Sequence, residues 1–228
     1  MSLVLVAHGT RKQQGVQMVG DLAQRVSATL RQPVHVSFVD VLGPTPSAVL
    51  ASMAGPAIVV PAFLSRGYHV TTDIPAHVAA SSHPDVTVTD ALGPGPQLVR
   101  VLADRLIESG WRRDDSVILA AAGTSDPEAR RDLHTTATWL SAITGSRVEL
   151  AFAATGLPRV PDAVATLRRR SRSRGRVVVA SYLLSDGLFQ GRLRASGADV
   201  VTEPLGTHPG LVRLIANRFR RACVPMAA

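Results

Sequence analysis

The 228-residue chain repeats itself, and this repeat limits the folds that it can adopt more than any other feature. Residues 92–100 match residues 205–213, and residues 3–10 match residues 117–124. Residues 38–40 likewise match residues 152–154, so the spacing persists along both halves. A repeat on this scale predicts two homologous domains. We place them at residues 1–112 and 113–228.

Within each half, short apolar runs alternate with segments whose apolar residues have helical spacing. In the first half, strands are predicted at residues 3–7, 34–39, 58–61 and 86–88, and helices at residues 19–30, 46–54 and 98–106. This alternation favours a parallel sheet of about four strands, covered by helices on both faces. The predicted fold class is therefore α/β, with two such domains and a site in the cleft between them.

Three polar side chains, His8, Asp40 and His69, follow the first three predicted strands. The carboxyl ends of parallel strands meet at one edge of a sheet, where ligands bind in open α/β folds. A side chain needed only by the fold should recur in the second half, yet all three are replaced there by apolar residues: Ala122, Ala154 and Phe189. The repeat therefore predicts a single site, carried by the first half.

Two imidazoles and a carboxylate suit two kinds of chemistry. They can bind Fe, Co, Ni or Zn as divalent ions, or they can accept protons near neutral pH. The sequence leaves both roles open, and Asp40 could also simply cap the turn before Pro44. Thr71 or Thr72 is expected to cap the helix that carries Pro75 in its first turn. The spacing of Asp73 and His77 also allows a helical surface pair.

Charge and composition limit the partners. The formal charge is +8, carried almost entirely by arginine, and the densest arginine run spans residues 168–176. We interpret this run as a solvated helix end, because no aromatic residue is interleaved for base stacking. No apolar run approaches the ~20 residues that cross a bilayer, and the N-terminus is typical of a strand rather than a signal peptide. With Cys223 as the single cysteine, we expect no internal disulfide and a cytoplasmic location.

Three motifs resemble the sirohydrochlorin chelatases, the class II tetrapyrrole chelatase family. They are His8-Gly9-Thr10-Arg11, then Phe38-Val39-Asp40, and the third-strand block from Val60 through Gly67, His69 and Asp73-Ile74-Pro75. The resemblance covers the whole chain, including its duplication. The family inserts Fe(II), Co(II) or sometimes Ni(II) into an octacarboxylate tetrapyrrole, which gives sirohaem or a cobalamin precursor.

The resemblance implies roles for particular residues. His8 and His69 would be catalytic and would bind the metal substrate together with Asp40, where the family usually has a glutamate. Arginine forks grip carboxylates in pairs of hydrogen bonds, and the tetrapyrrole-binding residues would be Arg11, Ser65, Arg66, Gly67 and Tyr68. The opposite wall would come from the second half, at Ala122, Ala154, Tyr182, Leu183, Leu184 and Phe189.

The implied partners are an anionic tetrapyrrole, sirohydrochlorin, and Fe²⁺ or Co²⁺, with neither nucleic acid nor membrane, in a monomer or a homodimer. Because Cys223 stands alone, no iron–sulfur cluster is expected. Two other functions stay open. A carrier of tetrapyrrole or metal would need the same residues without turnover. A histidine phosphatase also has His-Gly after its first strand, but it needs an arginine before that histidine, where this chain has Ala7.

Overall fold

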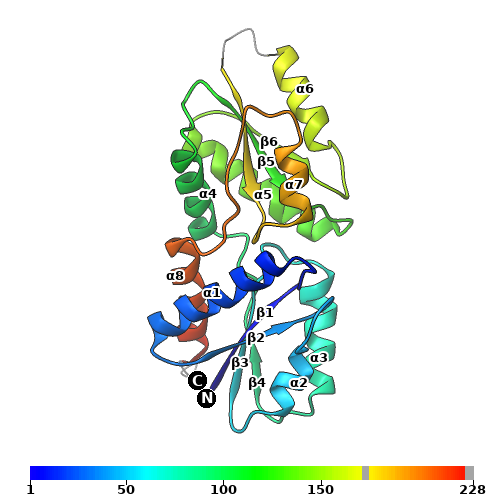
Figure 1. The fold of residues 1–228 in the computed structure, drawn as a ribbon, viewed down its shortest axis with the longest axis vertical. Helices are drawn as coiled ribbons and strands as arrows, with labels where there is room; N and C mark the ends of the chain where they lie inside the picture. The colour runs from blue at the N-terminus through cyan, green and yellow to red at the C-terminus, as the bar shows by residue number, and fades with distance from the viewer. Residues whose placement is uncertain (171–174, 224–228) are drawn as a thin grey trace. The chain divides into compact units, whose positions relative to one another are not determined.

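The computed structural model describes residues 1–170 and 175–223, which form two compact units (Figure 1). The first unit contains Met1–Gly93 and the chain from Thr207 onward, and the second contains Pro94–Gly206. Each unit holds one four-stranded parallel sheet flanked by helices, which confirms the predicted fold class. Among the described residues, no helix combines the length and the apolarity that crossing a bilayer requires.

The two sheets have the same topology. The first contains β1 (Ser2–Ala7), β2 (Val34–Phe38), β3 (Ala57–Pro61) and β4 (Val86–Val88), in the order β2-β1-β3-β4. The second contains β5 (Ser116–Ala121), β6 (Val148–Phe152), β7 (Val177–Tyr182) and β8 (Val200–Val201), in the order β6-β5-β7-β8. The central strands are buried on both faces, as the unbroken apolar runs predict.

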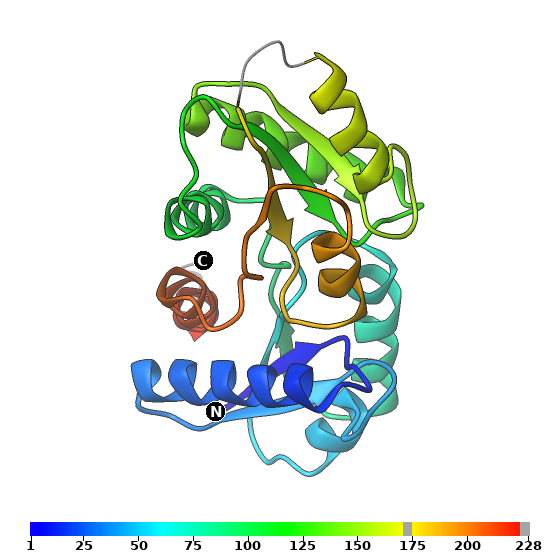
Figure 2. The same ribbon diagram turned by 45° about the horizontal axis from the view of Figure 1, so that its top comes forward.

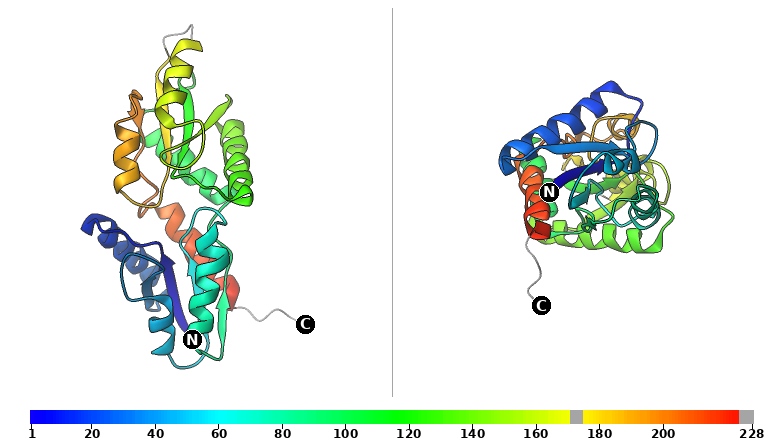
Figure 3. Two further views of the ribbon diagram at one scale, coloured as in Figure 1. Left: turned by 90° about the vertical axis from the view of Figure 1, so that its right-hand side faces the viewer. Right: turned by 90° about the horizontal axis from the view of Figure 1, so that it is seen from below.

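Helices cover both faces of the first sheet (Figures 1 and 3). On one face α1 (Gln13–Leu30) packs against α8 (Pro209–Cys223), and on the other α2 (Pro46–Ala51) packs against α3 (Ile74–Ala80). Successive β1 side chains alternate between these layers. Val4 and Val6 join the core under α2 and α3, where Leu50 and Ile74 are fully buried.

The second unit repeats this layering (Figure 2). There α4 (Pro96–Glu108) packs against α5 (Pro127–Thr144), while α6 (Val160–Arg170) and α7 (Leu188–Arg194) pack on the other face of the sheet. Ile118 and Val179 are fully buried in the core beneath α6 and α7.

The compact units divide the chain differently from the repeat. Helix α4 follows β4 in the first half of the sequence but packs in the second unit, and α8 of the second half packs in the first unit. The repeat limits of 1–112 and 113–228 therefore describe homologous stretches of sequence, whereas each compact unit takes its last helix from the other stretch. Sequence periodicity shows that each of these helices has an apolar face, but it does not show which sheet covers that face.

Both units share one backbone frame at the carboxyl edge of the sheet. Val39 N–H donates to the Ala7 carbonyl and Asp40 N–H to the His8 carbonyl, at 3.0 and 3.2 Å. The matching bonds run from Ala153 to Ala121 and from Ala154 to Ala122, at 2.9 and 2.8 Å. Positions 8 and 122, and positions 40 and 154, are therefore equivalent in backbone as well as in sequence.

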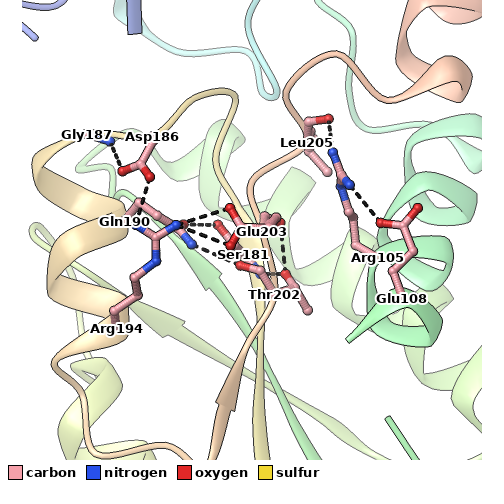
Figure 4. Close-up of polar contacts among 10 residues, drawn as sticks. All are labelled: Arg105, Glu108, Ser181, Asp186, Gly187, Gln190, Arg194, Thr202, Glu203 and Leu205. Carbon is pink, nitrogen blue, oxygen red and sulfur yellow. Dashed lines mark hydrogen bonds and ion pairs between the residues drawn. The ribbon is translucent and has the colours of Figure 1, made fainter. Parts of the chain in front are cut away.

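Buried polar side chains of the second unit hydrogen-bond to groups of the same unit. The Ser181 hydroxyl donates to Gln190 Oε1 at 2.6 Å, and Gln190 Nε2 donates to the Thr202 carbonyl at 2.9 Å, all within the buried interior (Figure 4). Before β5, Asp115 accepts two bonds from the Arg176 guanidinium, at 2.8 and 3.2 Å.

Candidate functional site

Two histidines lie side by side in the first unit. His8 follows β1 directly, and His69 begins a π-helical turn, η1 (His69–Asp73), that runs into α3. Their ring centroids are 4.5 Å apart and the ring planes are perpendicular. Because β1 and β3 are adjacent parallel strands, the chain leaves both at the same edge of the sheet. The structure thus brings together the two histidines that the sequence singled out.

The hydrogen bonds of the two rings define which nitrogens are available. His8 Nδ1 lies 3.1 Å from the Gly9 carbonyl oxygen, which can only accept, so Nδ1–H donates. His69 Nδ1 lies 2.5 Å from Asp73 Oδ2, and this bond places the donor hydrogen on Nδ1 in the same way. In each neutral imidazole the lone pair is then on Nε2. His8 is exposed and the His69 side chain is 32% exposed, so both rings are accessible.

Two aromatic side chains lie beside His69. The Phe63 ring centroid lies 5.8 Å from that of His69, and the Tyr68 centroid lies 6.1 Å away with the rings nearly perpendicular. Phe63 also packs against the core beneath α2 and α3, whereas Tyr68 is 64% exposed. One neighbour therefore anchors the imidazole to the unit, and the other presents an aromatic surface beside it.

Asp40 is at the same edge, but its carboxylate is used locally. Its Oδ1 accepts from Val41 N–H at 2.7 Å, and Val41 has a left-handed backbone, with φ 71°. Asp40 and Asp73 both line an open groove of about 450 Å³ beside α3. Across residues 1–170 and 175–223, no group of three His, Cys, Asp or Glu side chains is arranged to hold a metal ion. Contact of Asp40 with the metal substrate stays a prediction.

The loop between β3 and η1 carries most of the predicted tetrapyrrole-binding residues: Ser65, Arg66, Gly67 and Tyr68. The Gly67 carbonyl accepts from the N–H groups of Val70 and Thr71, at 2.9 and 3.1 Å, so this loop is tied to the π-helical turn. Arg66 and Arg11 are exposed. The helical stretch begins at His69, so the prediction that Thr71 or Thr72 caps it is wrong. The reason is that the turn closes through a bond from Ile74 N–H to the His69 carbonyl.

Asp73 was the functional candidate that sequence reasoning missed. The sequence suggested His77 as its helical partner, but Asp73 bonds to His69, and His77 Nδ1 lies 3.3 Å from the Ser47 hydroxyl instead. The spacing of four residues also separates His69 from Asp73, so the signal was present. It was overlooked because the helix was expected to begin after His69.

Two residues of the predicted opposite wall belong to a protein core instead. Leu183 lies in the core cluster beneath α6 and α7, and Tyr182 is 3% exposed. Burial raises the pKa of the Tyr182 hydroxyl, which is hydrogen-bonded to Thr136. These two side chains face inward because they continue the buried strand β7. Ala122 and Ala154 are half-buried, and Phe189 is 36% exposed with the Arg192 guanidinium over its ring at 5.7 Å.

Three arginines of the run that the structure describes form ion pairs within their own unit. Arg168 pairs with Asp199 at 2.8 Å, Arg170 lies 4.0 Å from Glu149, and Arg176 pairs with Asp115. Residues 171–174 lie outside the described residues. The prediction that the run binds no nucleic acid stays a prediction.

Comparison with known proteins agrees with this architecture. The CbiX family model matches residues 2–109 and again residues 116–222. The sirohydrochlorin ferrochelatase of Priestia megaterium is 24% identical over 96% of this chain and 89% of that protein. The sirohydrochlorin cobaltochelatase of Methanothermobacter thermautotrophicus is 28% identical, over 46% of this chain and 90% of that protein. The structure of SirB from Bacillus subtilis with Fe³⁺ superposes with a TM-score of 0.85 at 20% identity, covering 98% of this chain and 95% of that one.

These likenesses and the duplicated sheet define a two-domain α/β protein with the chelatase fold. Since the family model accounts for nearly the whole chain in two successive matches, the protein belongs to the CbiX family.

Proposed function

We propose that this protein is a chelatase that inserts a divalent metal ion, Fe²⁺ first and Co²⁺ next, into sirohydrochlorin in the synthesis of sirohaem or cobalamin. The observation that carries the proposal is the pair of adjacent imidazoles, His8 and His69, whose Nδ1 atoms are both engaged and whose Nε2 atoms both hold a lone pair. The named relatives, a ferrochelatase and a cobaltochelatase of sirohydrochlorin, support the substrate.

The chemistry of metallation matches two Nε2 lone pairs. Inserting a divalent ion removes two pyrrole N–H protons and delivers one cation to the ring centre. An imidazole Nε2 can accept a proton as a general base or bind a divalent metal substrate as a transient ligand. Placing two such atoms on one sheet edge lets a single small site serve the leaving protons and the entering ion.

We further propose that the tetrapyrrole is held by Arg11 and by the β3–η1 loop, residues 65–68. Arg66→Ala should raise the KM for the octacarboxylate substrate more than it lowers kcat, since its contact with peripheral carboxylates is the same before and after reaction. The matched control is Arg168→Gln, which breaks a surface ion pair with Asp199 and should leave both constants near wild type. A silent Arg66→Ala beside a damaging Arg168→Gln would contradict this placement.

Metallation of sirohydrochlorin, followed by its absorption spectrum with Fe(II), Co(II), Ni(II) and Zn(II) in turn, tests the proposal. A chelatase gives many product molecules per protein molecule, and the ratio of kcat/KM values identifies the preferred metal. A carrier gives one stoichiometric binding event and then stops. Absence of turnover with all four metals would refute the proposed function.

A further inference from the structure

We propose that Asp73 is a positioning residue of this site, which fixes the tautomer and the orientation of His69 so that its Nε2 lone pair points at the metal substrate. This inference rests on the proposed function and adds a residue to it. The contact itself is direct: Asp73 Oδ2 lies 2.5 Å from His69 Nδ1, and the two side chains are 27% and 32% exposed.

The π-helical turn explains why these two side chains meet. Its backbone closes through Ile74 N–H donating to the His69 carbonyl, so the turn has one residue more than an α-helical turn. The π-helix is rare, appears mostly as a single turn, and is frequent at functional sites. Residues four apart lie on the same side of such a turn, so Asp73 is held against the ring of His69 rather than free in solvent.

The second half provides an internal control. The same offset that pairs Gly67 with Gly187 and His69 with Phe189 pairs Asp73 with Leu193. Leu193 is fully buried in the core of its unit, and α7 is an ordinary α-helix. Both members of the polar pair are thus replaced by apolar residues in the copy. If Asp73 served only to start the helix, the copy should keep it without the histidine.

The carboxylate and the carbonyl act on the two histidines in different ways. A backbone carbonyl holds His8, so its tautomer follows from the main chain. The tautomer of His69 depends on a side chain, and a ligating histidine is commonly oriented by a carboxylate that accepts from its other ring nitrogen. Removing such a partner typically lowers metal affinity or activity by about 10–100-fold. His69 is therefore the histidine whose orientation a single side-chain substitution at a neighbouring residue can change.

The test uses Asp73→Ala and Asp73→Asn in the full-length protein, with Asp85→Asn, an exposed aspartate near β4, as control. Asp73→Ala should weaken binding of Co(II) alone, read from its visible absorption, by about tenfold or more. It should raise the KM for the metal while leaving the KM for the tetrapyrrole within twofold. Asp73→Asn carries an amide N–H that can donate to Nδ1 and so favour the Nε2–H tautomer, and it should be about as damaging as Asp73→Ala. Asp85→Asn should behave as wild type.

A spectroscopic readout separates positioning from a structural role. Nitrogen-15 NMR of the imidazoles should show His69 as the Nδ1–H tautomer in the wild type and a mixture in Asp73→Ala, with His8 unchanged. The proposal is overturned if Co(II) affinity in Asp73→Ala stays within twofold of wild type, if Asp73→Asn binds Co(II) as tightly as wild type, or if the His69 tautomer does not change. Since Co(II) binding and NMR need no turnover, these results stand apart from any failure of the metallation assay itself.

Discussion

The edge loops of the two units share a pair of backbone hydrogen bonds but carry different side chains. After β1 and β2, and again after β5 and β6, the same pair of interstrand bonds ties the two loops together. The first unit places His8, Asp40 and the His69–Asp73 pair on this frame, whereas the second places Ala122, Ala154, Phe189 and Leu193. The frame therefore belongs to the fold, whereas these polar side chains are specific to the first unit.

Charged side chains of the second unit form ion pairs that serve its own structure. The pKa of the Asp115 carboxyl lies below its usual range: burial alone would raise it, but bonds from the Arg176 side chain and from backbone N–H groups outweigh that effect. The Arg176 pKa is raised by the same partnership. Asp186, which precedes α7, and Glu203, which follows β8, both accept from Arg194 at the end of α7, and this raises the Arg194 pKa (Figure 4). These charged side chains pair with one another within their unit.

Removing either histidine should lower activity far more than the matching change in the second half. His8→Ala and His69→Ala should each lower metallation by about 10²–10⁴-fold, the usual cost of losing a general base, with little change in Tm. Phe189→Ala, the matching change in the second half, should weaken tetrapyrrole binding only severalfold to tenfold. Steady-state kinetics of the three variants checks this. Near-wild-type turnover in both histidine variants would place the site elsewhere.

Glycine substitutions should instead affect both halves alike. Gly9 and Gly123 have φ values of 88° and 127°, and an added Cβ would lie 2.2 Å from the Asp40 carbonyl oxygen or 2.1 Å from that of Thr155. Gly9→Ala and Gly123→Ala should each lower the free energy of unfolding by about 2 kcal/mol or more, through strain and overlap. Urea unfolding measures this. A harmless Gly123→Ala beside a damaging Gly9→Ala would show that the frame is not shared.

The contact of Asp115 with Arg176 is specific to the second half, because the first half has Met1 at the position that matches Asp115. Asp115→Asn should lower the free energy of unfolding at pH 7 by about 1–2 kcal/mol, since the partly buried N–H groups of Arg112 and Arg176 lose a charged acceptor. Because the folded pKa is depressed, the contribution of the carboxylate is present above about pH 4 and is lost as pH falls through the folded pKa. The stabilities of wild type and variant should converge below that point. A stability difference that does not shrink as the pH falls below about 4 would contradict this explanation.

The smallest expected effect concerns the turn after β2. Val41 has φ 71° in the first unit, while in the equally long loop of the second unit Gly156 has φ 116° and Thr155 is not among the described residues with positive φ. Val41→Gly should raise the free energy of unfolding by about 0.5 kcal/mol, because relief of left-handed strain exceeds the added entropy of the unfolded chain. Thr155→Gly relieves no strain and should lower it by a similar amount. Opposite signs in chemical unfolding confirm the difference between the loops, and equal signs would contradict it.

Much of this architecture could be predicted from the sequence, for physical reasons. Buried parallel strands are continuous apolar runs, so β1, β3, β5 and β7 were recognisable. The repeat also predicted a candidate site in the first half, because the matching positions of the second half are apolar. The exchange of α4 and α8 could not be predicted, because an amphipathic helix does not encode which of two similar sheets it covers. The contact between His69 and Asp73 was also missed, since a π-turn has no strong sequence signal and depends on a single shifted backbone bond.

The most direct test of the central claim is a crystal of this protein soaked with Co(II), measured at the cobalt absorption edge. The account predicts an anomalous peak at coordination distance from Nε2 of His8 and Nε2 of His69, with no peak at Ala122 or Phe189. A strong peak away from both histidines, or one at the matching loops of the second half, would contradict it.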